Sequence, residues 1–325
     1  MLQTRLTEKL DIKHPVIQAP MAFAAGGKLA ASVSQAGGLG LIGGGYGDPE
    51  WVDEQFTQAG NQPVGCGFIT WSLAKQPELL TRTLERKPKA IFLSFADPAP
   101  FVDEIKASGT TFICQVQRLD HAKHAVDCGA DIIIAQGTEA GGHGAKRATM
   151  TFVPEVADML ANRSPDTLLC AAGGIGDGRG LAASLMLGAD GVLVGSRFWA
   201  SSEALVGPNM HKASIAATGD ETIRSSVMDI ARRLDWPKDY TCRVLENPFT
   251  DRWHKDIDGL IANADEEADK WRTAWQKDDP QGSNTFVGEV TGLIHEIRPA
   301  ATILEGLVKE AEAVILSLGN AAIVK

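Results

Sequence analysis

Short, continuously apolar runs recur along the first 200 residues, separated by more polar stretches of helix-forming composition. Continuous apolar residues are typical of strands that are buried on both faces of a parallel sheet. The runs that fit such strands are Pro15–Ala19, Gly40–Ile42, Val64–Phe68, Ala90–Ser94, Thr111–Val116, Asp131–Ala135, Leu168–Ala172 and Gly191–Val194. The stretches that fit helices include Lys28–Ala36, Pro77–Arg86, Phe101–Ala107, Asp120–Cys128, Pro154–Ala161 and Gly178–Leu187. A doubly wound sheet alternates in the same way, but eight βα units favour an α/β fold of the (β/α)8 TIM-barrel type.

The pattern changes near Ser201, where the chain becomes charged, helical in character and rich in tryptophan. From Pro299 to Leu318 apolar residues follow helical spacing again. We therefore expect a cofactor-binding barrel in 1–200, a helical substrate lobe over the barrel mouth in 201–298, and a C-terminal helix returning to the barrel in 299–325. Three tryptophans are candidates for an apolar pocket lining, although core packing is the simpler interpretation: Trp199, Trp236 and Trp253.

The composition is that of a large folded protein, with 44% hydrophobic and 22% charged residues. A net charge of −10 argues against nucleic acid or an anionic membrane as a partner, without excluding an anionic small molecule. No apolar run is long enough to span a membrane and the N-terminal residues do not resemble a leader, so we expect a cytoplasmic protein. The five cysteines form no CxxC pair and no metal-ligand spacing is present, which predicts reduced thiols and no metal.

The segment from Leu168 to Ala200 carries the clearest chemical signal, because two predicted strands in it end in glycine-rich turns. The first ends in Gly173-Gly174 and the second in Gly195-Ser196. Backbone N–H groups can approach phosphate oxygens where no Cβ intrudes, and TIM barrels commonly hold a phosphate at their last two strands. We therefore predict a phosphate-bearing ligand here, with the start of the intervening helix adding its dipole.

A second glycine pattern, Gly38-Leu39-Gly40-Leu41-Ile42-Gly43, has the GxGxxG spacing of dinucleotide-binding folds. That fingerprint follows a strand and opens a helix. Here the preceding residues are helix-like, and the match runs through the second predicted strand. We interpret Gly43-Gly44-Gly45 as a loop at the barrel mouth instead.

The sixth predicted strand continues into a loop, Gln136–Gly144, that holds Glu139, His143 and several glycines. The carboxyl ends of barrel strands form the face on which TIM-barrel enzymes keep their chemistry. His143 supplies a group that titrates near neutral pH, and its flanking glycines let the chain approach a planar ring or a phosphate. A single histidine is often only structural, but this position predicts a catalytic one.

Three segments together resemble the nitronate monooxygenase family: Gln18-Ala19-Pro20-Met21, QGTEAGGHG at 136–144 and AAGGIGDGRGLAASLMLGADGVLVGSRF at 171–198. The resemblance covers about residues 12–205 and implies an FMN-dependent barrel with a helical lobe over the flavin. It implies oxidative denitrification of alkyl nitronates, or of nitroalkanes, with O2 to a carbonyl compound and nitrite. A related branch, the FMN-dependent enoyl-acyl-carrier-protein reductases, carries similar glycine loops, and some similar proteins reduce quinones. An NAD(P)H-dependent flavin reductase is therefore the alternative.

The resemblance also implies roles for individual residues. His143 would be the active-site histidine beside the flavin. The residues that would bind FMN are Ala19, Pro20, Met21, Gly67, Gln136, Gly141, Gly142, Gly173, Gly174, Gly195 and Ser196. Glycine at position 67 is a departure, because the family often has an asparagine there, and it indicates a divergent subgroup.

Two further interpretations stay open. A phosphate-binding barrel without flavin, such as an isomerase or an aldolase, would have no use for the His143 loop. A non-enzymatic binding module would not explain why so many polar residues lie together at the carboxyl end of the barrel. The expected partners are a small-molecule substrate and O2, and the exposed face of the lobe could also form a homodimer.

Overall fold

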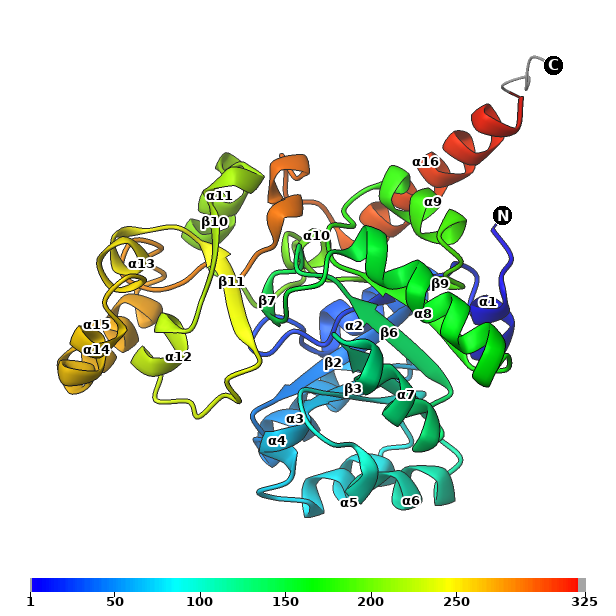
Figure 1. Ribbon diagram of the computed structural model, residues 1–325, viewed down its shortest axis with the longest axis horizontal. Coiled ribbons are helices and arrows are strands. Elements are labelled where there is room, and N and C mark those ends of the chain that lie inside the picture. Colours follow the sequence, from blue (N-terminus) through cyan, green and yellow to red (C-terminus); the bar gives the residue numbers. More distant parts are fainter. Residues whose placement is uncertain (1, 321–325) are drawn as a thin grey trace.

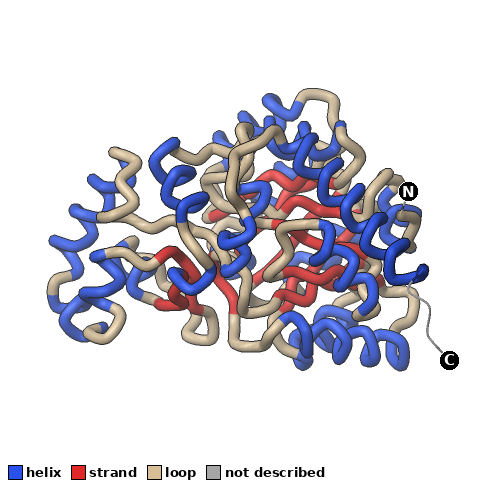
Figure 2. The backbone as a smooth tube through the Cα atoms, turned by 90° about the horizontal axis from the view of Figure 1, so that it is seen from above, coloured by secondary structure: helices blue, strands red, loops and turns tan. Residues whose placement is uncertain are grey.

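A closed barrel of eight parallel strands forms the centre of the protein in a computed structural model that describes residues 2–320 (Figures 1 and 2). Its strands are β1 (Val16–Gln18), β2 (Leu39–Gly45), β3 (Gly65–Ile69), β4 (Ala90–Ser94), β5 (Thr111–Val116), β6 (Ile132–Gln136), β8 (Leu168–Ala172) and β9 (Gly191–Val194). Each strand pairs with the next along the chain, and β9 closes the barrel on β1 with Leu193 opposite Ile17. The predicted (β/α)8 barrel is confirmed, and each predicted strand overlaps one of these eight.

Helices surround the barrel and cover the apolar outer face of its strands (Figure 1). Those that follow strands are α2 (Gly27–Gln35), α3 (Pro49–Ala59), α4 (Thr70–Leu73), α5 (Glu78–Glu85), α6 (Ala99–Ala107), α7 (Leu119–Asp127), α8 (Thr149–Arg163), α9 (Gly178–Met186) and α10 (Ser196–Trp199). The last helix, α16 (Ala300–Asn320), packs between α9 and α2. It therefore takes the place of the eighth outer helix after a long insertion, which explains why helical spacing returns at Pro299.

The inside of the barrel is filled with side chains, and a short N-terminal helix closes its lower end. Helix α1 (Arg5–Leu10) places Leu6 and Leu10 in the same apolar cluster as Ile17, Phe92 and other inward-facing strand residues. Both leucines are fully buried. Because the interior is packed in this way, the barrel can carry a ligand only at its open carboxyl end.

The insertion between α10 and α16 forms a lobe beside the barrel mouth (Figure 1). Its helices are α11 (Pro208–Ala216), α12 (Val227–Ala231), α13 (Pro248–Trp253), α14 (Ile257–Ala262) and α15 (Ala264–Gln276), with 3₁₀ turns η1 (Gly219–Glu221) and η2 (Glu289–Leu293). The predicted helical lobe also contains two strands, β10 (Thr222–Ser225) and β11 (Thr241–Leu245). These strands form an antiparallel sheet in the order β10-β11-β7.

Strand β7 (Gly142–Gly144) belongs to the barrel's predicted loop, and its partner β11 lies about a hundred residues later. A pairing across that separation leaves no local periodicity, which is why the sequence indicated only a loop. The glycines at 43–45 also differ from the prediction, since they extend β2 rather than form a loop. As predicted, the GxGxxG match runs through β2 and does not open a helix.

Substitution of Gly40 tests how closely β2 packs against α2. An added Cβ at Gly40 would overlap the backbone of Ala30 in α2, which cannot move without shifting the helix. We expect Gly40→Ala to lower the free energy of unfolding by at least ~2 kcal/mol. Gly306→Ala is the matched control, because Gly306 is exposed in α16 with no atom near the added Cβ. It should raise stability by about 0.5–1 kcal/mol. Urea denaturation measures both, and equal stabilities for the two variants would contradict this packing.

Candidate active site

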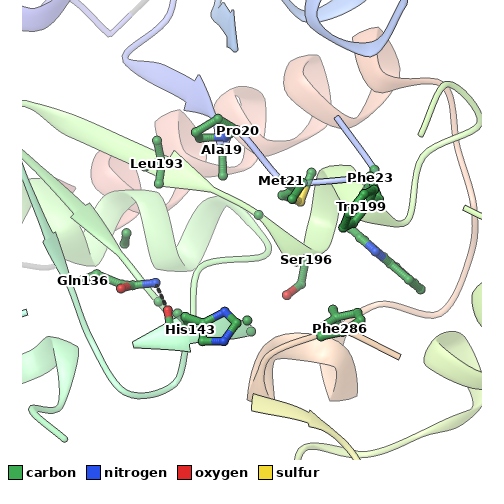
Figure 3. A pocket seen from close by; sticks show the side chains of 18 of the residues that line it. Ala19, Pro20, Met21, Phe23, Gln136, His143, Leu193, Ser196, Trp199 and Phe286 are labelled. Carbon is green, nitrogen blue, oxygen red and sulfur yellow. Dashed lines mark hydrogen bonds between the residues drawn. The ribbon is translucent and has the colours of Figure 1, made fainter. Parts of the chain in front are cut away.

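A cavity of about 410 Å³ lies at the carboxyl ends of the barrel strands, between the barrel and the lobe. Eleven of the twelve predicted site residues line it: Ala19, Pro20, Met21, Gln136, Gly141, Gly142, His143, Gly173, Gly174, Gly195 and Ser196. Figure 3 shows His143, Ser196, Trp199 and Phe286 around the same space. The cavity has the volume of an ordinary small-molecule or cofactor site.

Gly67 is the predicted site residue that does not line the cavity. It lies in β3 beneath Pro20, and an added Cβ would overlap the Pro20 ring. A larger side chain at position 67 would therefore displace Pro20, which does line the cavity. The packing of Pro20 gives a physical reason for glycine at this position.

His143 is held from two directions by residues of the lobe. Its Nε2 lies 3.0 and 2.9 Å from the two carboxylate oxygens of Asp229 in α12. Its ring stacks on Trp236 with 3.3 Å between ring centres and 6° between planes, and Phe95 meets it edge-on at 6.2 Å. The side chains of His143 and Asp229 are 8% and 5% exposed. The geometry therefore fixes both the position and the plane of the imidazole.

Burial lowers the pKa of His143 below its ordinary value, and the carboxylate of Asp229 partly opposes that shift. The charges of Arg232 and Arg224 lower the pKa further. The imidazole is thus neutral at pH 7. An ionised Asp229 can only accept a hydrogen bond, so Nε2–H donates to it and Nδ1 carries the lone pair. A neutral, oriented imidazole of this kind can accept a proton or a hydrogen bond.

Sequence reasoning missed Asp229 and left Trp236 undecided. Asp229 is 86 residues from His143 and belongs to no motif, so no local signal pointed to it. Trp199 and Trp236, two of the three tryptophans considered for the lining, do line the cavity. Trp253 packs instead in the core of the lobe.

Side-chain amides support the histidine loop from below. Gln136 Nε2 donates to the backbone carbonyl of His143 over 3.0 Å, the bond drawn in Figure 3. Gln136 Oε1 in turn accepts from Gln115 at 3.2 Å and from Gln117 at 2.9 Å. Gln115 also lines the cavity, although the sequence did not single it out. The side chain of Gln136 thus positions the loop that carries His143.

Two arginines, the half-buried Arg224 and the buried Arg243, hold the other side of that loop. Arg224 in β10 donates to the carbonyl oxygens of Thr138 and Ala140, both at 2.9 Å, and Arg243 in β11 donates to Thr138 at 3.0 Å. Burial lowers the pKa of Arg224 to about 10, so its guanidinium stays charged at neutral pH. Charge-assisted bonds to these carbonyls fix the loop between Gln136 and β7.

The glycine-rich end of the cavity can receive a phosphate-bearing group. Gly173 and Gly174 have left-handed φ values of +100° and +76° at the end of β8. An added Cβ at Gly195 would meet its nearest atom at 3.8 Å, whereas one at Gly173 would lie 2.9 Å from the carbonyl oxygen of Gly137 and one at Gly174 would lie 3.4 Å from Glu139. Open space therefore adjoins the backbone at Gly195, as a ligand held by N–H groups requires.

The dipole contribution expected from α9 stays a prediction, but its first amides are not free to bind a ligand. The first amides of α9 donate to carboxylates, Gly178 N to Glu310 at 2.7 Å and Arg179 N to Asp177 at 3.0 Å. They are therefore already committed within the protein. Ser196 lines the cavity as predicted, and its Oγ also accepts from Gly288 N at 2.9 Å.

A group of metal-ligand type lies on the surface, outside the residues that line the cavity. The ligand atoms of Asp97, His124 and Cys128 fall within 4.8 Å of one another, and His124 Nε2 is hydrogen-bonded to Asp97 at 2.7 Å. All five cysteines are free thiols, as expected. Among the described residues, no helix is both long and apolar enough to cross a membrane.

Comparison with known proteins gives consistent matches over nearly the whole chain. The profile of the family described as nitronate monooxygenase matches residues 3–65 and 69–310. A nitronate monooxygenase of Neurospora crassa is 31% identical over 92% of this chain and 90% of its own length. A hydroxy-methyl-oxo-octahydroindene carboxyl-CoA dehydrogenase of Rhodococcus jostii is 33% identical over 72% of this chain and 65% of its own. The solved structure of FabK from Thermotoga maritima superposes with a TM-score of 0.87 at 31% identity, covering 99% of this chain and 100% of FabK.

The contact between Asp229 and His143 can be tested directly. Because the carboxylate raises the pKa of His143 against the effect of burial, Asp229→Asn should lower that pKa further. Titration of the imidazole by NMR measures the change. Asp97→Asn is the matched control, since Asp97 pairs with His124 on the surface and should leave His143 unchanged. A higher pKa of His143 in Asp229→Asn would contradict the geometry.

Proposed function

This chain belongs to the nitronate monooxygenase family, and from that premise we propose that it oxidises alkyl nitronates with O2 to a carbonyl compound and nitrite, using FMN. It is thus an oxidoreductase. The observation that carries the proposal is a neutral, buried His143, oriented by Asp229, at a cavity that glycines also line. The cavity of about 410 Å³ and the open backbone at Gly195 support a flavin mononucleotide as its ligand.

The proposed cofactor residues divide between the two ends of the flavin. Ala19, Pro20 and Met21 would line its ring system, and the turns after β8 and β9 would hold its phosphate through backbone N–H groups. Bound FMN supplies the electron-transfer chemistry of the reaction. Residues of the barrel therefore place the cofactor, while residues 201–298 form the proposed substrate lobe.

His143 would act on the substrate. With its Nε2–H donated to Asp229, the neutral imidazole would remove the α-proton of a neutral nitroalkane through the lone pair of Nδ1. A hydrogen bond from the ring to the nitro oxygens would require a second proton on the imidazole. Phe95 and Trp236 pack around the ring and exclude water from it. Exclusion of water strengthens each polar interaction made with the substrate.

An NAD(P)H-dependent flavin reductase acting on a quinone or an enoyl thioester is the second candidate. It is supported by the carboxyl-CoA dehydrogenase relative and by the close likeness to FabK over the whole chain. Gly67, where the family often has asparagine, also favours a divergent branch. The two candidates differ in electron donor: the first takes electrons from the nitronate and the second from a nicotinamide.

Replacing His143 tests its role. His143→Asn should lower turnover by about 10²–10⁴-fold, as expected for loss of a general base or an orienting hydrogen bond, while FMN stays bound. Steady-state kinetics and the flavin absorbance spectrum measure the two effects. His121→Asn is the control, because His121 does not line the cavity. Unchanged turnover in His143→Asn would remove this residue from the mechanism.

Oxygen consumption separates the two candidate functions. The purified yellow protein should consume O2 and release nitrite when an alkyl nitronate is added without any nicotinamide. An oxygen electrode and a colorimetric nitrite assay measure both. If the flavin is bleached by NAD(P)H alone and O2 uptake with nitronate is absent, the reductase is the function and the proposal of nitronate oxidation fails.

A further inference from the structure

Arg232 is a buried cation in the wall of the cavity. It is the C-cap residue of α12, one turn after Asp229, and its side chain is 9% exposed. The guanidinium lies 5.2 Å from the ring centre of Tyr46, 5.4 Å from Phe286, 5.6 Å from Trp271 and 5.8 Å from Phe23. Four aromatic rings at this range stabilise the positive charge through cation–π contacts. The rings also hold the guanidinium in one place.

The donors of Arg232 are not used within the protein. Among residues 2–320, none accepts a hydrogen bond from its guanidinium, and its ion pair with Asp229 spans 3.9 Å. The oxygens of Asp229 lie closer to His143, at 2.9 and 3.0 Å. An arginine carries five N–H donors, and a buried charge is normally paired and hydrogen-bonded. The N–H donors of Arg232 are therefore available to a ligand that enters the cavity lined by this residue.

The surroundings of Arg232 indicate the shape of that ligand. A second cavity of about 370 Å³ adjoins the first, and both are lined by Phe23, Tyr46, Trp275, Phe286 and Arg232 itself. Of the Arg and Lys residues that the structure describes, Arg232 alone lines the first cavity. Aromatic walls favour a flat apolar body, while a planar guanidinium matches a carboxylate bidentately.

We propose that Arg232 determines substrate specificity by binding the carboxylate of a substrate whose body is aromatic, with the reacting carbon beside His143. The inference rests on the proposed function for the identity of the reacting group, a nitronate. A purely structural arginine would be expected to hydrogen-bond Asp229, and the 3.9 Å separation argues against that role. The negative charge of Asp229 faces the same region, and its oxygens lie nearer to His143, at 2.9 and 3.0 Å, than to Arg232, at 3.9 Å.

Equilibrium binding tests the inference without any turnover. The FMN-loaded protein is titrated with para-toluate and with para-toluamide, which have the same shape and differ in charge, while tryptophan fluorescence and calorimetry follow binding. The wild-type protein should bind the carboxylate at least ~10-fold more tightly than the amide, because charge-assisted hydrogen bonds exceed neutral ones. Equal affinity for the two compounds in the wild-type protein overturns the inference before any variant is made.

Variants then assign the preference to Arg232. Arg232→Gln should weaken para-toluate binding by roughly 10- to 100-fold and leave para-toluamide binding unchanged, with Arg232→Lys intermediate. Arg163→Gln is the matched control, since it removes one positive charge from an exposed pair with Asp127 in α7. Equal losses for carboxylate and amide, or an equal loss in Arg163→Gln, would contradict the assignment. If Arg232→Gln does not fold, the ratio between the two ligands in Arg232→Lys decides.

Steady-state kinetics test whether the carboxylate site contributes to the reaction. The nitronates of para-(nitromethyl)benzoate and of phenylnitromethane are compared, and Arg232→Gln should raise KM for the first alone. Absence of turnover with either nitronate, while selective carboxylate binding persists, would refute the proposed function and leave the binding site standing. Turnover of both nitronates with identical KM in wild type and Arg232→Gln would refute the specificity role alone.

Discussion

The antiparallel pairing of β7 with β11 is the contact on which the site depends. Gly142–Gly144 leaves the barrel at the end of β6, and the lobe supplies the strand that satisfies its backbone, with His143 opposite Cys242. Buried backbone N–H and C=O groups must be paired, so this short segment is extended only because the lobe lies against it. The same sheet carries Arg224 and Arg243, which hold the carbonyls of the loop before β7. Barrel and lobe therefore build one site together.

Burial has the largest effect on the pKa of His143 at the cavity. Desolvation lowers the pKa of His143 from its ordinary 6.5, so the unfolded chain takes up a proton at this residue more readily than the folded protein. The stability that the neutral histidine contributes is thus complete above about pH 6.5 and declines as the pH falls through the folded-state pKa. Asp229 limits this cost by hydrogen-bonding the ring. Burial thus keeps His143 neutral at neutral pH, and the hydrogen bond to Asp229 orients its ring.

Aromatic residues of both the barrel loops and the lobe surround His143 and Arg232, in contrast with the glycines at the ends of β8 and β9. Trp236 and Phe95 enclose His143, while Tyr46 and Phe286 face Arg232. Small residues let a cofactor approach the backbone, whereas large rings exclude water and offer flat surfaces to a substrate. The glycines would thus receive the cofactor and the aromatic rings the substrate, as we propose.

The barrel, its glycine turns and the position of His143 were determined by the sequence itself, because each depends on local pattern. Strands buried on both faces read as apolar runs, and glycines at strand ends mark places where the backbone meets a ligand. The tertiary structure alone decided which residues contact His143 and the glycines. Asp229 reaches His143 and Arg232 reaches the cavity only when α12 folds over the barrel mouth. Gly67 lies beneath Pro20 only when the strands close. Contacts between residues so far apart along the chain leave no periodicity to read, since they arise from how the lobe packs on the barrel.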